Sequence, residues 1–482
     1  MSSAGGMNTR TPKADESWRS ADLRALARTG AVHFMGIGGA GMSPIAELLV
    51  RGGGNVSGCD SHRSDAADAL GALGVRVSVG HDATHVADAT ALVITSAVNA
   101  QHPEVAAARA RGIPVLKRAQ ALGSIVNTGT VVAVAGTHGK TTTTAMISAI
   151  LLEAGLDPTG FVGGRVAGWG GGLVVGSGSL FVVEADEYDR SFFTLQPTVA
   201  IVTSIEADHL EIYGDLAGLE DAFAEFLDTV PQNGRIIACI DDEGVRRVID
   251  RIADGRVLRY GTHASATLQA TDIRGEGHGS RYAVREDGRV LGELEVLLPG
   301  LHNVRNSLAA FAAARHVGAD FGAAARGLRG FAGVGRRFER VGIRGDVLFI
   351  DDYAHHPTEL AATLSAARAS LGGRRIVAVF QPHLYSRTRD LANDFGRALL
   401  AADVVWVTDV YGAREQPVEG VTGELVADAA KNAGASDVRY VPDLAQLETD
   451  LLAALQPGDA CIGMGAGNIN EVIRRVHARR VA

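Results

Sequence analysis

The stretch that decides the fold runs from Thr130 to Thr142 and reads TVVAVAGTHGKTT. Its first six residues are apolar or β-branched, as in a buried strand, and a glycine-rich loop follows at once. Glycines in such a loop expose N–H groups to phosphate oxygens, a lysine faces the β- and γ-phosphates, and a hydroxyl faces Mg²⁺. The loop is shorter than the usual GxxxxGK[ST] pattern. It predicts a strand, a helix and, between them, nucleotide contacts from Gly136, Thr137, His138, Gly139, Lys140, Thr141 and Thr142.

Lysine is rare in this chain. Only Lys13, Lys117, Lys140 and Lys431 are lysines among 46 cationic residues. A turn followed by a surface lysine is the alternative interpretation of the loop. Because a motif that requires lysine has few chances to arise by accident here, we favour the phosphate-binding interpretation.

Two further apolar runs end beside acidic residues and a histidine. Residues 180–184 end at Glu184, and residues 199–203 precede the segment Glu206 to His209. Mg²⁺ prefers carboxylates beside nucleotide phosphates, so Glu184 is a candidate metal ligand opposite Thr141. His209, at the carboxyl end of an adjacent parallel strand, would point into the same crevice. A solvated acidic loop and a structural histidine are the alternatives.

A second glycine-rich loop lies upstream. Residues 31–35 predict a strand, and Gly36 to Gly41 read GIGGAG before a predicted helix. Backbone N–H groups of such a loop approach a diphosphate at the helix N-terminus. Asp60 ends the next predicted strand, where it could accept a hydrogen bond from a ribose hydroxyl. The pattern fits a dinucleotide or any nucleotide diphosphate, and a tight turn without a ligand remains an alternative.

Polar clusters follow two predicted strands downstream. Residues 347–350 precede DDYAHHP (351–357), and residues 375–380 precede QPHLYSR (381–387). Ligands of α/β sheets bind at such strand ends. Arg336 could enter the phosphate site as an arginine finger does. Each feature alone is more often a salt bridge or a helix cap, whereas their joint placement favours a site.

Strand and helix patterns alternate along the chain, and this cadence restarts three times. Such alternation predicts an α/β protein with mainly parallel sheets. We expect a tail and short helix over 1–28, a Rossmann-like domain over 29–128, a phosphate-loop domain over 129–334 and a second Rossmann-like domain over 335–482.

Composition narrows the class of partner. The 482 residues include 46 % hydrophobic and 21 % charged residues, with a formal net charge of −9, which argues against nucleic acid and anionic membranes. No apolar run is long enough for a signal peptide or a membrane span, so we expect a cytoplasmic protein. Cys59, Cys239 and Cys461 are far apart, which excludes a disulfide framework or a cysteine-rich zinc site. We expect them in buried strands, without a role.

Taken together, these motifs resemble the Mur ligases of peptidoglycan synthesis. The matching segments span nearly the whole chain in the order of that family. They are residues 33–42, 136–142, 184–189, 206–209, 301–306, 335–338, 352–357 and 381–387.

The resemblance implies an activity and a set of site residues. It implies ATP-dependent joining of L-alanine to the lactyl carboxylate of UDP-N-acetylmuramate through an acyl phosphate, with Mg²⁺ or Mn²⁺. The UDP-sugar would contact Gly38, Gly39, Ala40, Asp60, His81 and Ser96. ATP would contact residues 136–142, Asn303, Arg336 and Asp352, and the metal would contact Thr141, Glu184 and His209. The carboxylate and the amino acid would meet Tyr353, His355, His383 and Arg387, and catalysis would depend on Lys140, His209, Arg336, Asp352 and His355.

Two departures from family patterns stand out. Leu384 occupies a position where the resemblance implies arginine, which affects how the carboxylate is anchored. Related ligases that add later residues use a carbamylated lysine to hold a second Mg²⁺. This chain has no lysine between Lys140 and Lys431.

A neutral His355 or His209 is the candidate general base for the incoming amine.

Three other functions compete with this interpretation. A nucleotide-dependent oxidoreductase would use the first glycine loop but leaves the phosphate loop, Glu184 and Arg336 unexplained. A non-enzymatic NTP switch predicts slow hydrolysis that is indifferent to amino acids. A recycling ligase of the same fold would attach a preformed peptide to the same sugar.

Overall fold

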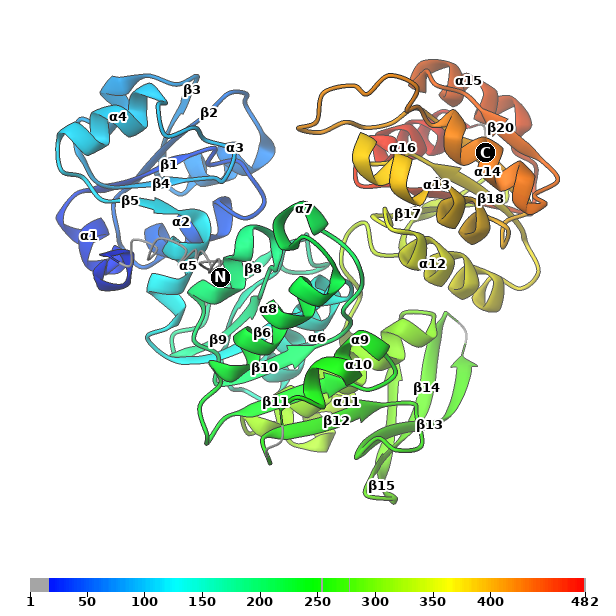
Figure 1. Ribbon diagram of the computed structural model, residues 1–482, viewed down its shortest axis with the longest axis horizontal. Coiled ribbons are helices and arrows are strands. Elements are labelled where there is room, and N and C mark those ends of the chain that lie inside the picture. The colour runs from blue at the N-terminus through cyan, green and yellow to red at the C-terminus, as the bar shows by residue number, and fades with distance from the viewer. Residues whose placement is uncertain (1–16, 253–254, 277, 481–482) are drawn as a thin grey trace, which may run out of the picture. The chain divides into compact units, whose positions relative to one another are not determined.

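The computed structural model describes residues 17–252, 255–276 and 278–480. It contains three sheets, as the alternating pattern predicts, and each sheet is mainly parallel (Figure 1). The chain divides into two compact units, residues up to Thr130 with Tyr188–Gln196, and the remainder. The predicted tail lies largely outside the described residues, and the short helix is α1 (Leu23–Thr29).

The N-terminal unit contains a five-stranded parallel sheet of order β3-β2-β1-β4-β5. The strand order reverses between β1 and β4. In α/β sheets, ligands bind at such a reversal of the strand order. Its strands are β1 (Ala31–Met35), β2 (Val56–Asp60), β3 (Arg76–Val79), β4 (Ala89–Ile94) and β5 (Val115–Lys117). Its other helices are η1 (Ser17–Ser20), α2 (Ser43–Arg51), α3 (Asp65–Ala72), η2 (Ala83–Val86), α4 (Pro103–Ala110) and α5 (Arg118–Val126).

One segment of this unit comes from far along the chain. The short helix η3 (Tyr188–Thr194) packs on α5, where Asp189 lies 2.7 Å from the Nζ of Lys117. The Thr194 hydroxyl donates to the carbonyl of Ala119 at 3.0 Å. The segment therefore belongs to the first unit although its sequence neighbours belong to the second.

The central sheet has ten strands in the order β15-β14-β13-β12-β11-β10-β6-β9-β7-β8. Helices α6, α10 and α11 pack together and bury Ile147, Phe311 and Leu328 in one apolar core with the strands. The strands are β6 (Thr130–Ala135), β7 (Thr159–Phe161), β8 (Leu173–Val174), β9 (Leu180–Glu184), β10 (Val199–Val202), β11 (Arg235–Cys239), β12 (Val257–Gly261), β13 (Leu268–Glu276), β14 (Gly279–Glu286) and β15 (Arg289–Val296). The helices are α6 (Lys140–Glu153), α7 (Leu210–Tyr213), α8 (Leu216–Asp228), α9 (Glu243–Ile249), α10 (Leu301–His316) and α11 (Phe321–Gly330).

Strands β13 to β15 depart from the expected alternation. They form an antiparallel meander that extends the central sheet, without intervening helices (Figure 1). Asp287 and Gly288, both with positive φ, make the turn between β14 and β15. An Asp-Gly pair between strands is a hairpin signal, because both residues tolerate the left-handed conformation.

The third sheet has the order β16-β17-β21-β18-β19-β20, in which the β16–β17 pair is antiparallel and the others are parallel. Its strands are β16 (Glu339–Arg344), β17 (Val347–Asp352), β18 (Arg375–Phe380), β19 (Val404–Val407), β20 (Val438–Tyr440) and β21 (Asp459–Met464). Its helices are α12 (Pro357–Ser370), α13 (Tyr385–Leu399), α14 (Glu424–Ala433), α15 (Leu444–Ala454) and α16 (Ile469–Arg479).

Within the described ranges, no helix has the length and apolar character needed to span a membrane.

Candidate functional site

The phosphate loop joins β6 to the N-terminus of α6, as the sequence predicts. Gly139 caps α6 with a φ of +84°, a conformation that favours glycine. A Cβ on Gly136 would lie 2.1 Å from the hydroxyl oxygen of Thr203, so this position has no room for a side chain. The backbone N–H of His138 donates to the Ser204 hydroxyl at 3.0 Å. The loop is thus held against the residues that follow β10, and His138 and Gly139 at the helix N-terminus line a cavity.

Lys140 is held inside its own loop. Its Nζ donates to the Gly136 carbonyl at 2.6 Å and lies 2.7 Å from a carboxylate oxygen of Glu187. Burial alone would lower the pKa of Lys140, but Glu187 and Asp186 outweigh burial and raise it. The ammonium therefore keeps its charge. A phosphate that binds Lys140 must compete with Glu187 for it.

An oxygen-rich corner lies beside Lys140. The Thr141 hydroxyl donates to Glu184 at 3.0 Å, and the N–H of Gly163 donates to the same carboxylate. Burial raises the pKa of Glu184. A hydroxyl from the first turn of α6 and a carboxylate from the end of β9 are oxygen ligands that suit a hard cation such as Mg²⁺.

His209, the third expected metal ligand, begins α7 with a φ of +55°. Its ring nitrogens lie 3.8 Å from Asp208 and 3.6 Å from Glu211. Both carboxylates are close neighbours of His209 in the sequence, and its role at the metal stays a prediction.

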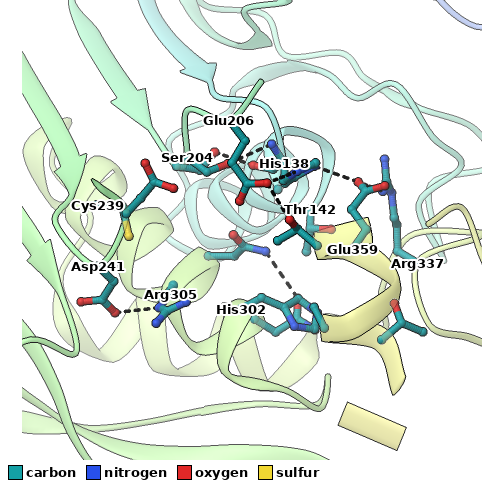
Figure 2. Close-up of a pocket in the computed structure, with 18 of the residues that line it drawn as sticks. His138, Thr142, Ser204, Glu206, Cys239, Asp241, His302, Arg305, Arg337 and Glu359 are labelled. Atoms are coloured by element: carbon teal, nitrogen blue, oxygen red, sulfur yellow. Dashed lines mark hydrogen bonds and ion pairs between the residues drawn. The ribbon is translucent and has the colours of Figure 1, made fainter. Parts of the chain in front are cut away.

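A cavity of about 300 Å³ opens beside the phosphate loop (Figure 2). Both the central and the third domain supply its walls. The central domain contributes His138, Gly139, Thr142, Thr203, Ser204, Glu206, Cys239, Asp241, Asp242, Tyr260, His302, Asn303, Arg305 and Asn306. The third domain contributes Arg337, Phe338, Asp352, Thr358, Glu359, Ala362 and Thr363.

His138 lies between two carboxylates in the wall of this cavity (Figure 2). Its Nε2 lies 3.4 Å from Glu206 and its Nδ1 lies 3.2 Å from Glu359 of α12. Burial alone would lower the pKa of His138, but the two carboxylates raise it to about 9. The imidazolium therefore links the phosphate loop to the third domain at neutral pH. The Thr358 hydroxyl adds a hydrogen bond to Glu206 at 2.6 Å.

Neighbouring arginines of the third domain point to different partners. Arg336 donates to the carbonyls of Gly465 and Gly467 at 2.5 and 3.1 Å, and its guanidinium lies 4.8 Å from the Tyr353 ring centre. Arg337 lines the cavity and lies 3.7 Å from Glu359. The sequence pattern singled out Arg336 and did not indicate that Arg337 lines the cavity.

Asp352 and Asn303, two of the residues predicted to contact ATP, both lie in the cavity wall. Asp352 accepts hydrogen bonds from the N–H groups of Phe338 and Ala354 at 2.7 and 2.8 Å. Burial raises the pKa of Asp352 to about 6, against the opposing effect of Arg337. The side chain of Asn303 donates to the Pro299 carbonyl at 2.8 Å, which fixes its orientation.

The residues expected to meet the carboxylate and the amino acid form a second group. The His355 ring lies 5.3 Å from Tyr353 and 5.7 Å from His383, between ring centres. Burial lowers the pKa of His355, and it lowers that of His383 to about 4. Both imidazoles are therefore neutral at pH 7, the state required of a general base.

Arg387 joins this group to the central domain. Its Nη2 lies 2.6 Å from Asp208, and Nη1 lies 3.5 Å from Nδ1 of His383. Burial alone would raise the pKa of Asp208, but Arg387 lowers it well below its usual range. Leu384 precedes α13 with a φ of +69° and is buried, so it presents no cation to a carboxylate.

The glycine loop of the N-terminal unit lies between β1 and α2. Asp60 accepts a hydrogen bond from the Gly38 N–H at 3.0 Å, so the carboxylate expected at a ribose also orders the loop. Gly39, Ala40 and Ser96 are exposed, as a binding surface requires. His81 is partly exposed, and its Nδ1 lies 3.2 Å from the Cys59 sulfur.

Several lining residues escaped the sequence analysis. Arg305 and Asp241 form an ion pair at 2.6 Å in the cavity wall, and Glu359 forms an ion pair with His138 (Figure 2). Asp241 lies two residues after the end of β11, and Glu184 is the last residue of β9, so the strand-end rule that selected Glu184 could also have found Asp241. Glu359 is the third residue of α12 and accepts hydrogen bonds from the N–H groups of His355 and His356, so the local pattern explains it as a helix cap and does not indicate the cavity.

The phosphate loop and the cavity beside it define a nucleotide-binding α/β protein, with acidic and basic groups of a third domain in the wall. Comparison with known proteins is more specific, and the chain belongs to the Mur ligase family. The family models match in chain order: "Mur ligase family, catalytic domain" over residues 31–130, "Mur ligase middle domain" over 134–314 and "Mur ligase, glutamate ligase domain" over 336–467.

Individual relatives agree with this assignment. The chain is 45 % identical over 453 residues to a UDP-N-acetylmuramate–L-alanine ligase of Salinibacter ruber, covering 93 % of this chain and 95 % of the relative. It is 46 % identical over 455 residues to the enzyme of that name from Acidothermus cellulolyticus, covering 94 % and 95 %. The crystal structure of a UDP-N-acetylmuramate–alanine ligase from Thermotoga maritima matches with a TM-score of 0.80 and 30 % identity, over 93 % of this chain and 99 % of that one.

Proposed function

We propose that this chain joins L-alanine to the lactyl carboxylate of UDP-N-acetylmuramate, with ATP as co-substrate and ADP and phosphate as products. The observation that carries the proposal is the cavity where the phosphate loop meets Asp352 and Arg337 of the third domain. The names of the relatives, at 45 and 46 % identity over nearly the whole chain, support this choice of substrates.

The first chemical step is transfer of the γ-phosphoryl group to the carboxylate. This transfer makes an acyl phosphate and releases ADP. Lys140 and Arg336 offset negative charge on the transferring group, and such electrostatic stabilisation dominates phosphoryl transfer. In the structure Lys140 contacts Glu187, and Arg336 contacts the carbonyls of Gly465 and Gly467. Both cations therefore exchange partners when ATP binds.

Mg²⁺ suits the oxygen atoms of Thr141 and Glu184, which lie 3.0 Å apart. His209 completes the proposed ligand set. When bound, the cation would neutralise charge on the phosphate oxygens.

The second step forms the amide bond. The amino group of alanine must attack as a free base, so a neutral imidazole takes up its proton. His355 fits this role because its pKa is lowered and Glu359 lies 3.3 Å from its Nδ1. The tetrahedral intermediate then collapses, and phosphate leaves. Arg387 and His383 hold the carboxylate ends of the substrates in this proposal.

The test is phosphate release from ATP with UDP-N-acetylmuramate, measured with L-alanine, with each other amino acid, with a preformed peptide and with no acceptor. Turnover is expected only when ATP, the sugar nucleotide and L-alanine are all present. A full rate without any acceptor would indicate a simple NTPase. A preference for the peptide would indicate a recycling ligase instead.

A further inference from the structure

A buried cluster in the N-terminal unit has no part in the proposed reaction. It consists of His33 on β1, Cys59 on β2, His85 on η2 and Glu104 on α4. One potential ligand atom from each residue lies within 4.8 Å of all the others. His33, Cys59 and Glu104 are buried, and the side chain of His85 is 20 % exposed. The cluster is thus enclosed, with His85 on the side that solvent can reach.

The fold brings these four residues together from separate elements. Strands β1 and β2 are parallel neighbours, and Met35 pairs with Cys59 in their register. Helices η2 and α4 contact each other, and Val86 and Val105 bury Cys59 in one apolar cluster. The N–H of Asp82 donates to Glu104 at 2.9 Å, which orients the carboxylate. The strand register thus positions Cys59, and a backbone N–H positions Glu104.

Distances within the cluster suit a four-coordinate metal ion. The Cys59 sulfur and the His85 Nδ1 lie 3.3 and 3.2 Å from the two carboxylate oxygens of Glu104. The His33 Nε2 lies 3.8 Å from that carboxylate. Tetrahedral zinc with bonds of about 2.0 to 2.3 Å places neighbouring ligand atoms about 3.3 to 3.8 Å apart. Small side-chain rotations would be enough to complete the site.

His33 has an unused nitrogen that faces the cluster. Its imidazole is 2 % exposed, and its Nε2 has no hydrogen-bond partner. Its Nδ1 lies 2.9 Å from the Ser57 hydroxyl. If Nδ1 carries the proton toward Ser57, the Nε2 lone pair is free, which is how metal-binding histidines are oriented. Burial lowers the pKa of His33 to about 4, so the ring is neutral at pH 7 and suited to ligate a metal.

Charge also points to a cation. Glu104 is fully buried, and its ion-pairing neighbours within 4.0 Å, in the part of the chain that is described, are the imidazoles of His33, His81 and His85. None of these carries a permanent charge. The N–H of Asp82 and the thiol of Cys59 donate to Glu104 but are neutral, and a buried carboxylate without an opposite charge costs free energy. A divalent cation together with Glu104 and a Cys59 thiolate sums to zero.

We propose that His33, Cys59, His85 and Glu104 form a binding site for one zinc-type divalent cation. Two nitrogens, one sulfur and one carboxylate oxygen are ligands that zinc prefers and Mg²⁺ does not. Binding forms a bond between the metal and the Cys59 sulfur and releases the thiol proton to solvent. No oxidant or reductant takes part.

The site lies directly beneath the first glycine loop. The N–H groups of Gly36 and Ile37 donate to the Cys59 carbonyl at 2.8 and 3.1 Å, and the next residue, Asp60, holds Gly38. A bound cation therefore fixes the end of β2 that supports the loop. Because the cation binds only the folded state, it raises the temperature of unfolding.

The experiment uses the full-length chain without an affinity tag, stripped of metal and free of nucleotide. Titration with Co²⁺ is expected to show one tight equivalent with thiolate-to-cobalt charge-transfer absorption and the intense visible bands of four-coordination. Zn²⁺ should displace the cobalt and raise the unfolding temperature. Cobalt bound without the thiolate band would overturn the proposal, because the metal would then lie at a site that supplies no cysteine.

Variants assign the signal to this cluster. Cys59→Ser should abolish the charge-transfer band, and His85→Gln should weaken binding on the order of 100-fold or more, since even outer partners of metal ligands are worth 10 to 100-fold. Cys461→Ser is the matched control, because Cys461 is equally buried in β21 but belongs to no such cluster in the described residues. Unchanged binding in both Cys59→Ser and His85→Gln would refute the site. His85 is partly exposed, so its variant keeps the test decisive even if Cys59→Ser fails to fold.

Discussion

Lys140 is expected to stabilise the transferring phosphoryl group, and it also balances the charge of the buried Glu187. A pair of substitutions can separate these two roles. Lys140→Ala removes the cation that faces the phosphoryl group, so kcat should fall on the order of 10³-fold, by analogy with arginine fingers. It also leaves Glu187 buried without its partner, which destabilises the fold. The double variant Lys140→Ala with Glu187→Gln should recover the unfolding temperature but not kcat. Lys431→Ala, at an exposed ion pair on α14, is the control, and near-normal kcat in Lys140→Ala would remove this residue from the mechanism.

We expect substitution of the two adjacent arginines, Arg336 and Arg337, to cause different kinetic defects. Arg336→Ala should lower kcat on the order of 10³-fold if its guanidinium leaves the carbonyls of Gly465 and Gly467 for the phosphoryl group. Arg337→Ala, which removes a wall of the cavity, should chiefly raise KM for ATP. Steady-state kinetics of both variants show which arginine acts on kcat and which acts on KM for ATP. The opposite pattern would assign the phosphoryl contact to Arg337.

At the residue scale, the glycines and Lys140 were predictable because backbone access and lysine chemistry leave a strict local pattern. His138 was expected only as part of the phosphate loop. Its ion pair with Glu359 depends on a helix more than 200 positions away, and no local spacing encodes that contact. The cluster around Cys59 was missed for the same reason, since its members come from four separate elements.

At the element scale, α12 is coupled to the phosphate loop through a titratable contact. The pKa of His138 is raised from 6.5 to about 9 by Glu359 and Glu206, against burial. The folded state therefore binds this proton more tightly than the unfolded state does. Its stabilisation is fully present below about pH 6.5 and is lost as the pH rises through about 9. We expect the unfolding temperature to fall over that window.

Calorimetry from pH 6 to 10 on the unaltered chain and on His138→Gln isolates this effect. The glutamine keeps a hydrogen-bond donor but cannot titrate, so the difference between the two unfolding temperatures should shrink as the pH rises. A difference that stays constant with pH would show that the His138 contact is not the source.

The strands that were predictable are those buried in parallel sheets. The apolar runs at β6, β9, β10, β17 and β18 are continuous because helices cover such strands. Strands β13 to β15 alternate polar and apolar residues at an edge of the sheet, and they were missed although Asp287-Gly288 marks their turn. The antiparallel partner β16, with its exposed positions, was missed for the same reason.

At the scale of the whole molecule, the two nucleotide loops lie in separate compact units. Asp60→Ala removes the acceptor that orders the first glycine loop, so KM for the UDP-sugar should rise while KM for ATP stays nearly unchanged. Measuring both KM values in the same assay tests this separation. Equal weakening of both substrates would contradict the assignment of the loops.

Packing across long sequence separations sets the limit on what could be predicted at this scale. Segment Tyr188–Gln196 joins the N-terminal unit through Asp189 and Thr194, although it follows the strand that ends at Glu184. Sequence order placed it in the central domain. Its contacts with α5 involve partners about seventy positions upstream, which periodicity within a window cannot register.

The distribution of lysine over the whole chain excludes one form of metal binding. Related ligases hold a second Mg²⁺ with a carbamylated lysine from the helix downstream of the motif histidine. Here that helix, α8, reads LAGLEDAFAEFLD and contains no lysine. Lys117 pairs with Asp189, Lys140 lies in the phosphate loop, Lys431 pairs with Asp428, and Lys13 lies outside the described residues.

Arginine cannot replace a carbamate, because its guanidinium stays protonated and forms no such anion. A second Mg²⁺ would therefore depend on phosphate oxygens, water and existing ligands, which agrees with the tendency of Mg²⁺ to keep several waters. Activity should be the same in degassed buffer without bicarbonate and in buffer supplied with it, at fixed pH. The measurement is the rate of phosphate release after exhaustive removal of CO₂. A reversible loss of activity that bicarbonate restores would require a carbamate ligand, and so would refute this account of the metal site.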